Sequence, residues 1–133
     1  MARHTGRSGS RWNDASLVLR VQAPGLSILL PGDVEAAGEQ AILESGRIAR
    51  ADVLKVAHHG SATSSTPDFL SAVSPRVAVL SLGAWNRFGF PEPGLPERLR
   101  RQGVRVFRTD RDGAVTLTGA GGRITVRHGT GDP

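Results

Sequence analysis

The stretch that decides the expected fold is Asp52-Val53-Leu54-Lys55-Val56-Ala57-His58-His59-Gly60-Ser61. Its first six residues form a short, largely apolar run, which is typical of a strand buried on both faces of a sheet. Two histidines and a glycine follow directly. In open α/β sheets, functional side chains gather in the loops beyond the carboxyl ends of the strands. The stretch therefore predicts a buried strand that leads into a functional loop.

Outward from this strand, apolar runs of strand length alternate with segments of helical spacing. The expected elements are strands at 16–21 and 26–30 around the Pro24-Gly25 turn, a helix at 34–45 ending at Gly46, a helix from Thr66-Pro67 to before Pro75, a strand at 76–82, a helix at 95–102 ending at Gly103, a strand at 104–107, and a hairpin of 113–118 with 123–127. This order predicts an α/β domain with a mixed sheet, flanking helices and a terminal hairpin.

Length and composition narrow the protein class. A chain of 133 residues has room for one domain, which we place at 13–127, after a flexible basic lead-in at 1–12 and before a tail at 128–133. The absence of cysteine excludes disulfide scaffolds and thiol catalysis. No apolar run approaches the roughly 20 residues that span a bilayer, and the basic start lacks the apolar centre of a secretory signal. The net charge of +5 comes from arginines spread along the chain, with Lys55 as the only lysine, so charge alone assigns no partner.

Asp33 and His58 are the leading candidates for metal ligands. Asp33 follows an apolar strand and Gly32, and His58 follows the next strand along the chain. A carboxylate and an imidazole together supply donors suited to Zn or Mn. Neighbouring strand residues point to opposite faces, but Gly60 allows a sharp bend that turns both rings to one cleft. We expect His58 to be the ligand and His59 either to support the ligands from behind or to face the substrate, with the reverse assignment open.

Other polar positions carry weaker signals. Asn13-Asp14 is either a turn or part of a site, and Asn86-Arg87 is either ordinary loop structure or a phosphate contact. Asp110-Arg111-Asp112-Gly113 lacks the spacing of a calcium loop and predicts a tight turn before the hairpin. His4 and His128 lie in polar terminal stretches and are expected to be solvated.

Five segments, taken together and in order, resemble the metallo-β-lactamase domain of the ComEC DNA-uptake proteins over about residues 12–118. They are Asn13-Asp14-Ala15-Ser16-Leu17-Val18-Leu19, Pro31-Gly32-Asp33, the stretch 52–61 quoted above, Asn86-Arg87-Phe88-Gly89, and Arg108-Thr109-Asp110-Arg111-Asp112-Gly113. The Leu-Lys-Val-Ala-His-His-Gly-Ser string is the most specific of them.

The resemblance implies an αβ/βα sandwich with a metal cleft between two sheets. It implies that Asp33 bridges two metal ions and that His58 ligates one of them. We expect His59 to take part in catalysis. Substrate contacts are expected from the other polar motif residues, Asn13, Ser61, Asn86 and Arg87. In that family the domain is thought to be a metal-dependent nuclease, using Zn or Mn, that degrades one DNA strand while the other enters through a membrane channel. The family is membrane-associated with this domain expected outside the cytoplasm, whereas this chain by itself is expected to be soluble.

Two departures from the family pattern change the expectation. The H-x-H/D-x-D-H motif that supplies most of the metal ligands is absent, and Phe90 stands where the family usually has histidine. Phenylalanine has no lone pair and cannot bind a metal. The chain therefore resembles the carboxyl-terminal half of such a domain, with weak or no metal binding alone and one apolar face of a half-built sandwich exposed.

Three functions follow from these observations. The first is an incomplete metallohydrolase domain with inherited nuclease chemistry that is inactive in this chain alone. The second is a non-catalytic, arginine-rich module that binds DNA or a partner protein. The third is a hydrolase completed by the remaining portion of the domain in another chain or by a homodimer.

Overall fold

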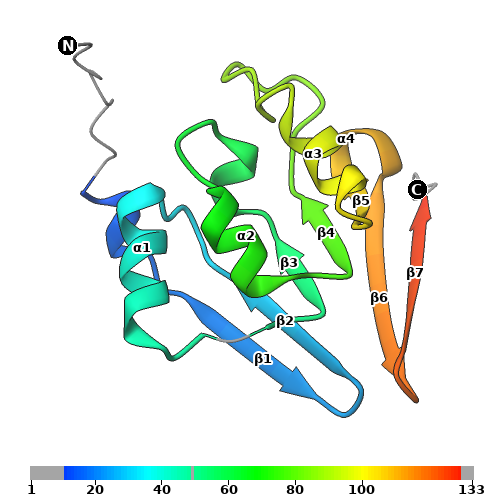
Figure 1. Cartoon of the computed structure of the whole chain (residues 1–133). Coiled ribbons are helices and arrows are strands. Elements are labelled where there is room, and N and C mark those ends of the chain that lie inside the picture. Colours follow the sequence, from blue (N-terminus) through cyan, green and yellow to red (C-terminus); the bar gives the residue numbers. More distant parts are fainter. Residues whose placement is uncertain (1–10, 49, 130–133) are drawn as a thin grey trace.

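A five-stranded sheet forms the centre of the protein in a computed structural model that describes residues 11–48 and 50–129 (Figure 1). The strands follow one another across the sheet in chain order: β1 (Leu19–Ala23), β2 (Leu26–Leu30), β3 (Val53–Lys55), β4 (Val77–Leu80) and β5 (Arg105–Arg108). β1 and β2 are antiparallel, and the other neighbours are parallel. The sheet is therefore mixed, and the carboxyl ends of β2 to β5 share one edge.

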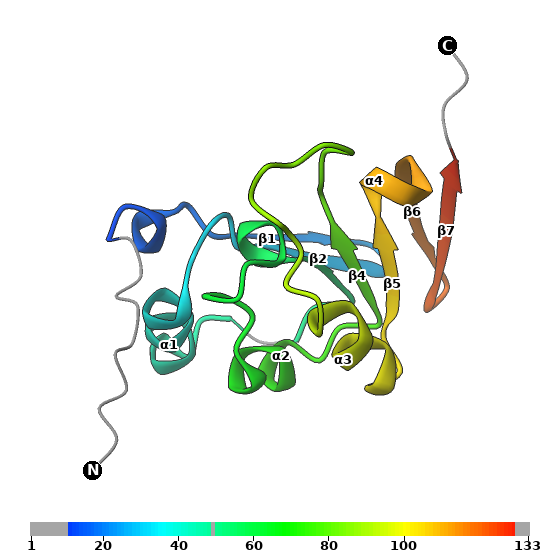
Figure 2. The same cartoon turned by 90° about the horizontal axis from the view of Figure 1, so that it is seen from above.

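Three helices cover one face of this sheet: α1 (Ala36–Ser45), α2 (Pro67–Val73) and α3 (Leu95–Arg101) (Figure 2). The main core lies between these helices and the sheet, and its largest fully buried side chains include Phe69, Leu29, Leu54, Leu80 and Leu99. The start of α2 is the one expected from sequence, since the Thr66 hydroxyl accepts a hydrogen bond from the Phe69 amide at 3.4 Å and Pro67 occupies the first turn.

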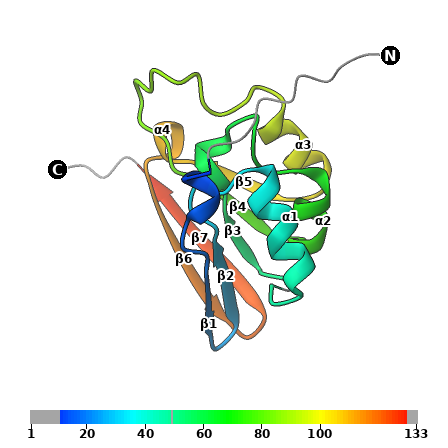
Figure 3. The same ribbon diagram turned by 90° about the vertical axis from the view of Figure 1, so that its left-hand side faces the viewer.

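The terminal hairpin, β6 (Ala114–Ala120) and β7 (Arg123–Gly129), forms a second sheet on the opposite face (Figure 3). A smaller core of Val53, Val77 and Ile124 lies beneath it. The approach is close at Gly119, where an added Cβ would lie 2.5 Å from the Leu26 Cβ. Two strands cover less of the sheet than five strands offer, so β1 stays outside this contact and all five of its residues are exposed.

The predicted order of strands and helices is confirmed, but the first strand was placed too early. The apolar run at 16–21 suggested its bounds, whereas β1 begins at Leu19 and ends at Ala23. The reason is the register of the hairpin, which pairs Ala23 with Leu26 and Leu19 with Leu30. A short turn at Pro24-Gly25 fixes that pairing whatever the polarity of the residues in the strand.

The first helix also begins later than predicted, at Ala36 instead of Val34, because Asp14 caps it from a distant segment. Asp14 lies in the 3₁₀ turn η1 (Asn13–Ala15), and its Oδ1 accepts hydrogen bonds from the backbone amides of Glu35, at 2.9 Å, and Gly38, at 3.1 Å. These are amides at a helix start that have no partner within the helix.

Replacing Asp14 with alanine is expected to lower the free energy of unfolding by about 1–2 kcal/mol, because it removes the acceptor of two helix-start amides. Asp14→Asn keeps an oxygen at the same place and should retain most of the stability. Urea unfolding followed by circular dichroism measures both variants. Equal losses in the two would show that the carboxylate charge, not the capping oxygen, is what matters.

The tight turn expected at 110–113 is a single helical turn, α4 (Thr109–Asp112). Arg108 forms a two-pronged ion pair with Asp110, with Nε–Oδ1 at 3.0 Å and Nη2–Oδ2 at 2.7 Å. His128 is exposed, as expected, although it lies within β7 with its ring 5.2 Å from that of Phe107. His4, most of the expected lead-in and the last four residues lie outside the described residues. Among the described helices, none has the length and apolar character needed to cross a bilayer.

Candidate functional site

The loops that follow β2 and β3 meet at the shared carboxyl edge of the sheet and carry the candidate site. Asp33 lies three residues beyond the end of β2, and His58 and His59 lie just beyond β3, in the 3₁₀ segment η2 (Ala57–Gly60). The His58 amide donates to the Gly32 carbonyl at 3.0 Å, which holds the two loops together. The sequence-based expectation that acidic and imidazole groups converge at this edge is therefore met.

Both histidines have left-handed backbone conformations, with φ of 47° at His58 and 54° at His59. Non-glycine residues adopt this region at a cost of about 1–2 kcal/mol each. The sequence predicts a bend at Gly60. In the structure the bend extends over His58, His59 and Gly60, because Gly60 also has a positive φ, of 82°. Leaving the strand in this way removes the alternation of side chains that a regular strand would impose.

His59 faces Asp33. Its Nε2 lies 3.9 Å from Oδ1 of Asp33, and its Nδ1 lies 2.7 Å from the carbonyl oxygen of Ser81. A carbonyl can only accept, so Nδ1 carries a proton and donates it to Ser81, which leaves Nε2 facing the carboxylate side. A ring held through one nitrogen by a backbone carbonyl is the usual state of a metal-ligating or proton-accepting histidine.

His58 pairs with a carboxylate that sequence analysis missed, that of Glu35. The distance from His58 Nδ1 to Glu35 Oε1 is 3.5 Å, and Glu35 is buried. The structure thus pairs Asp33 with His59 and Glu35 with His58, and of the two assignments that the sequence left open this places His59 nearer to Asp33. The signal was present in the sequence, because Glu35 follows Asp33 by two residues in the same loop after β2.

Lys55 contributes positive charge beside Asp33. Burial at the end of β3 lowers the pKa of the Lys55 ammonium group, and the Asp33 carboxylate partly offsets that effect. The only lysine of the sequence therefore lies within electrostatic reach of the candidate site.

Phe90 contacts both imidazoles, which shows that this position faces the site. Its ring centroid is 5.5 Å from that of His58, edge to face, and 6.4 Å from that of His59 in a nearly parallel arrangement. The apolar ring of Phe90 therefore closes one side of the candidate site.

The residues expected to bind substrate are placed differently from one another. The Ser61 hydroxyl is buried and bonded to the Thr63 hydroxyl at 2.9 Å. Asn13 lies in η1, in the same turn as Ser16, whose hydroxyl accepts from the Asp33 amide at 3.1 Å. Ser61 is thereby linked to Glu35 through Thr63, whose hydroxyl donates to Glu35 Oε1.

Asn86 and Arg87 lie in the loop between β4 and α3. The Asn86 side chain donates to the Phe90 carbonyl at 3.0 Å and accepts from the Phe90 amide at 2.9 Å, while Arg87 is exposed. Asn86 therefore holds the shape of its own loop, and Arg87 is the one of the two that is open to an incoming ligand.

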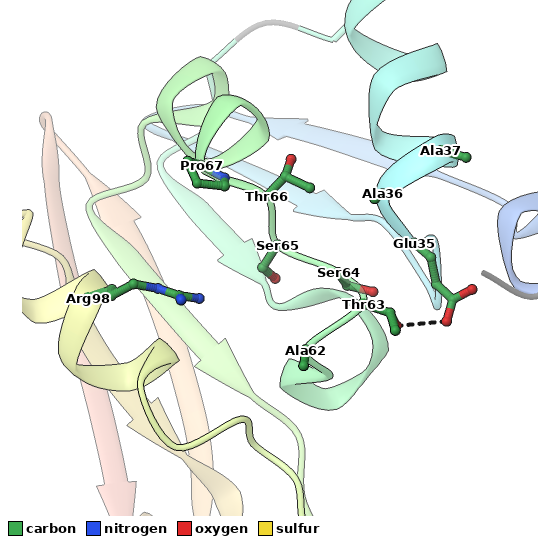
Figure 4. A pocket seen from close by; sticks show the side chains of 10 residues that line it. All are labelled: Glu35, Ala36, Ala37, Ala62, Thr63, Ser64, Ser65, Thr66, Pro67 and Arg98. Atoms are coloured by element: carbon green, nitrogen blue, oxygen red, sulfur yellow. Dashed lines mark hydrogen bonds between the residues drawn. The ribbon is translucent and has the colours of Figure 1, made fainter. Parts of the chain in front are cut away.

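A pocket of about 510 Å³ adjoins the site on the helix side (Figure 4). The Thr63 hydroxyl donates to Glu35 Oε1 at 2.7 Å, so Glu35 lies between the pocket and His58. From the other wall, the Arg98 side chain extends from α3 toward the loop that carries Ser65 (Figure 4). Of the Glu35–His58 pair, Glu35 therefore lines this pocket.

The donors present do not complete a metal centre. Within residues 11–48 and 50–129, no three His, Asp or Glu side chains lie close enough together to hold an ion. A catalytic zinc ordinarily takes three ligands from protein. The geometry supplies two facing pairs, so any ion at this edge needs at least one further ligand.

Comparison with known proteins gives several strong matches. ComE operon protein 3 of Bacillus subtilis (strain 168) is 40% identical over 77% of this chain and 13% of its own length. Competence protein ComA of Neisseria gonorrhoeae is 41% identical over 83% of this chain and 16% of its own length. These competence proteins of the ComEC family are homologues of this chain. Recombination protein 2 of Haemophilus influenzae (strain ATCC 51907 / DSM 11121 / KW20 / Rd) is 41% identical over 79% of this chain and 13% of its own length.

The chain spans only about one-seventh of the length of these relatives, 13% to 16%. No protein-family model matches it. The homology therefore concerns one segment of much longer competence proteins, and that segment includes the candidate site.

Proposed function

We propose that this chain forms the carboxyl-terminal half of a metallo-β-lactamase-fold domain that hydrolyses DNA with a divalent metal ion, Zn or Mn, during competence. The homologues named above are competence proteins, which supports the biological setting. The proposed chemistry is hydrolysis of a phosphodiester, and the proposed substrate is a DNA strand.

The arrangement of Asp33 and His59 is the observation that carries this proposal. The 3.9 Å between Oδ1 and Nε2 is too long for a hydrogen bond. Two donor atoms that each lie about 2.1 Å from one tetrahedral ion are about 3.4 Å apart, so a closing movement of about 0.5 Å would bring this pair to the separation that a shared ion requires. The Ser81 carbonyl fixes the His59 ring so that Nε2 faces this space. His59 is thereby favoured over His58 as the partner of Asp33, which is the reverse of the first assignment.

The missing ligands must come from outside the described residues, and the exposed apolar edge of the sheet supports such a partner. Leu19 and Val21 of β1 are 46% and 45% exposed, and Leu17 beside them is 75% exposed. β1 pairs only with β2 in the described chain, so its outer edge also offers unpaired backbone groups. We assign this surface to the remaining portion of the domain, and completion by a second copy of the chain is an outcome of the test.

The test joins the chain to the upstream segment of a homologous competence protein and follows the degradation of end-labelled DNA with Mn²⁺. We expect degradation by the fusion and none by the chain alone. Asp33→Asn and His59→Gln should each slow it by at least about 100-fold. Asp68→Asn, an exposed carboxylate in the first turn of α2, is the matched control and should leave the rate unchanged.

Other results would overturn the proposal or part of it. A fusion that neither degrades DNA nor binds Mn²⁺ by calorimetry rules out the metallohydrolase. Activity of the unfused chain that rises with the square of its concentration assigns the missing half to a second copy. DNA binding with a steep salt dependence, unchanged by chelator and by Asp33→Asn, supports the arginine-rich binding module instead.

A further inference from the structure

The loop between β4 and α3 presents aromatic side chains to solvent directly beside the candidate site. Trp85 is 93% exposed and Phe88 is 78% exposed, although both are among the largest apolar side chains of the sequence. Burying such a ring contributes about 1.5–3 kcal/mol to stability, and the fold forgoes this contribution for two rings in one loop. This exposure is a sign of a ligand.

The rings are ordered into a stack that leads out of the site. His59 lies nearly parallel to Phe90, at 17° and 6.4 Å, and Phe90 lies nearly parallel to Phe88, at 18° and 5.5 Å. These are offset-stacked arrangements of the kind that aromatic rings prefer. Phe88 is the last ring of the stack and the most exposed one, so a planar ligand can extend the stack there.

The backbone of the loop holds this stack in place. The Asn86 side-chain amide exchanges two hydrogen bonds with the backbone of Phe90 and donates to the Gly83 carbonyl at 3.4 Å, which closes the loop on either side of Phe88. Phe88 and Phe90 also line a hollow of about 230 Å³, together with Ser61, Thr63 and Pro93. Phe88 therefore has the fixed ring of Phe90 on one side and free space next to it.

The charge of the loop indicates which planar ligand fits. Arg87 is exposed between Trp85 and Phe88, and the whole chain carries a net charge of +5. Among macromolecules, single-stranded nucleic acid combines free planar rings with a phosphate on every residue. In a duplex the faces of the bases are covered by their neighbours, so only an unpaired base can stack on Phe88.

We propose that the loop Trp85–Phe90 is a stacking platform on which an unpaired base of a DNA single strand lies against Phe88, while Arg87 contacts a neighbouring phosphate. This inference rests on the proposed function, because it names the strand form that reaches the site. It assigns the recognition of that form to Phe88 and makes Phe90 and Asn86 positioning residues.

The test compares two labelled oligonucleotides of equal length and charge, one of thymidines and one of abasic residues, by fluorescence anisotropy at fixed salt. We expect the wild-type chain to bind the thymidine strand roughly 5- to 150-fold more tightly. Phe88→Ala should abolish this preference and Phe88→Tyr should retain it. Arg87→Gln should leave the preference intact and reduce the dependence of affinity on salt.

Trp12→Ala is the matched control, because Trp12 is an 87% exposed aromatic side chain at η1, outside this loop. It should leave the base preference unchanged, and circular dichroism should show that every variant is folded. Equal affinity for the two strands, or no binding to either, overturns the platform. Phe88-dependent binding to uncharged phosphatidylcholine vesicles without a base preference also overturns it, and assigns the loop to a membrane surface.

These outcomes are separable from the test of the proposed function. A base preference in a protein whose fusion does not degrade DNA keeps the platform and removes the hydrolase. Degradation by the fusion without any base preference does the opposite.

Discussion

Substitution of Glu39 by alanine is expected to lower the free energy of unfolding by about 4 kcal/mol. Glu39 lies in α1 and is fully buried, and its carboxylate accepts hydrogen bonds from the backbone amides of Ser65, at 2.5 Å, and Thr66, at 2.8 Å. These amides belong to the loop that enters α2. Alanine leaves both amides buried without an acceptor, and each such group costs roughly 1–3 kcal/mol.

Urea unfolding of the wild type and of three variants measures this effect. Glu39→Gln keeps one acceptor oxygen and should lose about half as much as Glu39→Ala. Glu44→Ala, an exposed glutamate on the same helix, should change stability by no more than about 0.5 kcal/mol. A loss at Glu39→Ala no larger than that of the exposed control would contradict the role of the carboxylate in holding the loop.

The same carboxylate makes stability depend on pH. Burial raises the pKa of Glu39, and the hydrogen bonds from Thr66 and Ser65 oppose this without cancelling it. The folded protein therefore takes up the proton at a higher pH than the unfolded chain does. As the pH falls from 7 toward the ordinary value of 4.5, the wild type should gain stability relative to Glu39→Gln, whose amide does not titrate. A difference that stays constant between pH 7 and 4.5 would exclude this linkage.

Substitution of Gly60 by alanine is expected to destabilise the fold by about 2–5 kcal/mol and to displace the imidazoles. A Cβ at this position would lie 2.7 Å from the Pro91 Cβ and 3.0 Å from the Leu80 Cδ2, and the φ of 82° strains any side chain. Overpacking costs roughly 1–3 kcal/mol and the left-handed conformation about 1–2 more. Pro91 adjoins Phe90, so relief of the clash moves the ring that packs on His58 and His59.

Gly46→Ala is a matched control for this prediction. Gly46 ends α1 with a φ of 63°, and an added Cβ there meets nothing within 4 Å. It should therefore show only the cost of the backbone conformation. Denaturant unfolding gives the two losses of stability, and the imidazole resonances in nuclear magnetic resonance spectra report the histidine rings. Similar losses and unmoved imidazole resonances in both variants would show that the space around Gly60 is larger than the structure indicates.

Much of the fold was predictable because local signals and long-range packing agree. The Thr66-Pro67 cap, the apolar strands and Gly46 each mark a boundary that the structure keeps. The start of α1 and the bounds of β1 were not predictable in this way. Asp14 acts on the helix from more than twenty residues away, and the strand register is set by its partner, so neither effect is visible in a local window.

The position of the candidate site was predictable from the sequence, whereas the ion pairs within it were not. Its position follows from where strands end, which the sequence reveals. Which imidazole meets which carboxylate depends on two consecutive left-handed residues and on the Ser81 carbonyl, and apolar periodicity carries no information about either. Glu35 carries no signal beyond its closeness to Asp33 in the sequence, because an acidic residue at this position also fits the first turn of a helix.

The left-handed backbone conformations of His58 and His59 also bear on the balance between stability and function in this sequence. Glycine or asparagine adopts that backbone geometry with less strain, so a chain optimised only for folding would carry one of them at these two positions. Two histidines at these positions therefore lower the stability of the fold through backbone strain. Mutational libraries screened for heat resistance alone should enrich glycine at 58 and 59, whereas libraries screened for biological activity should not.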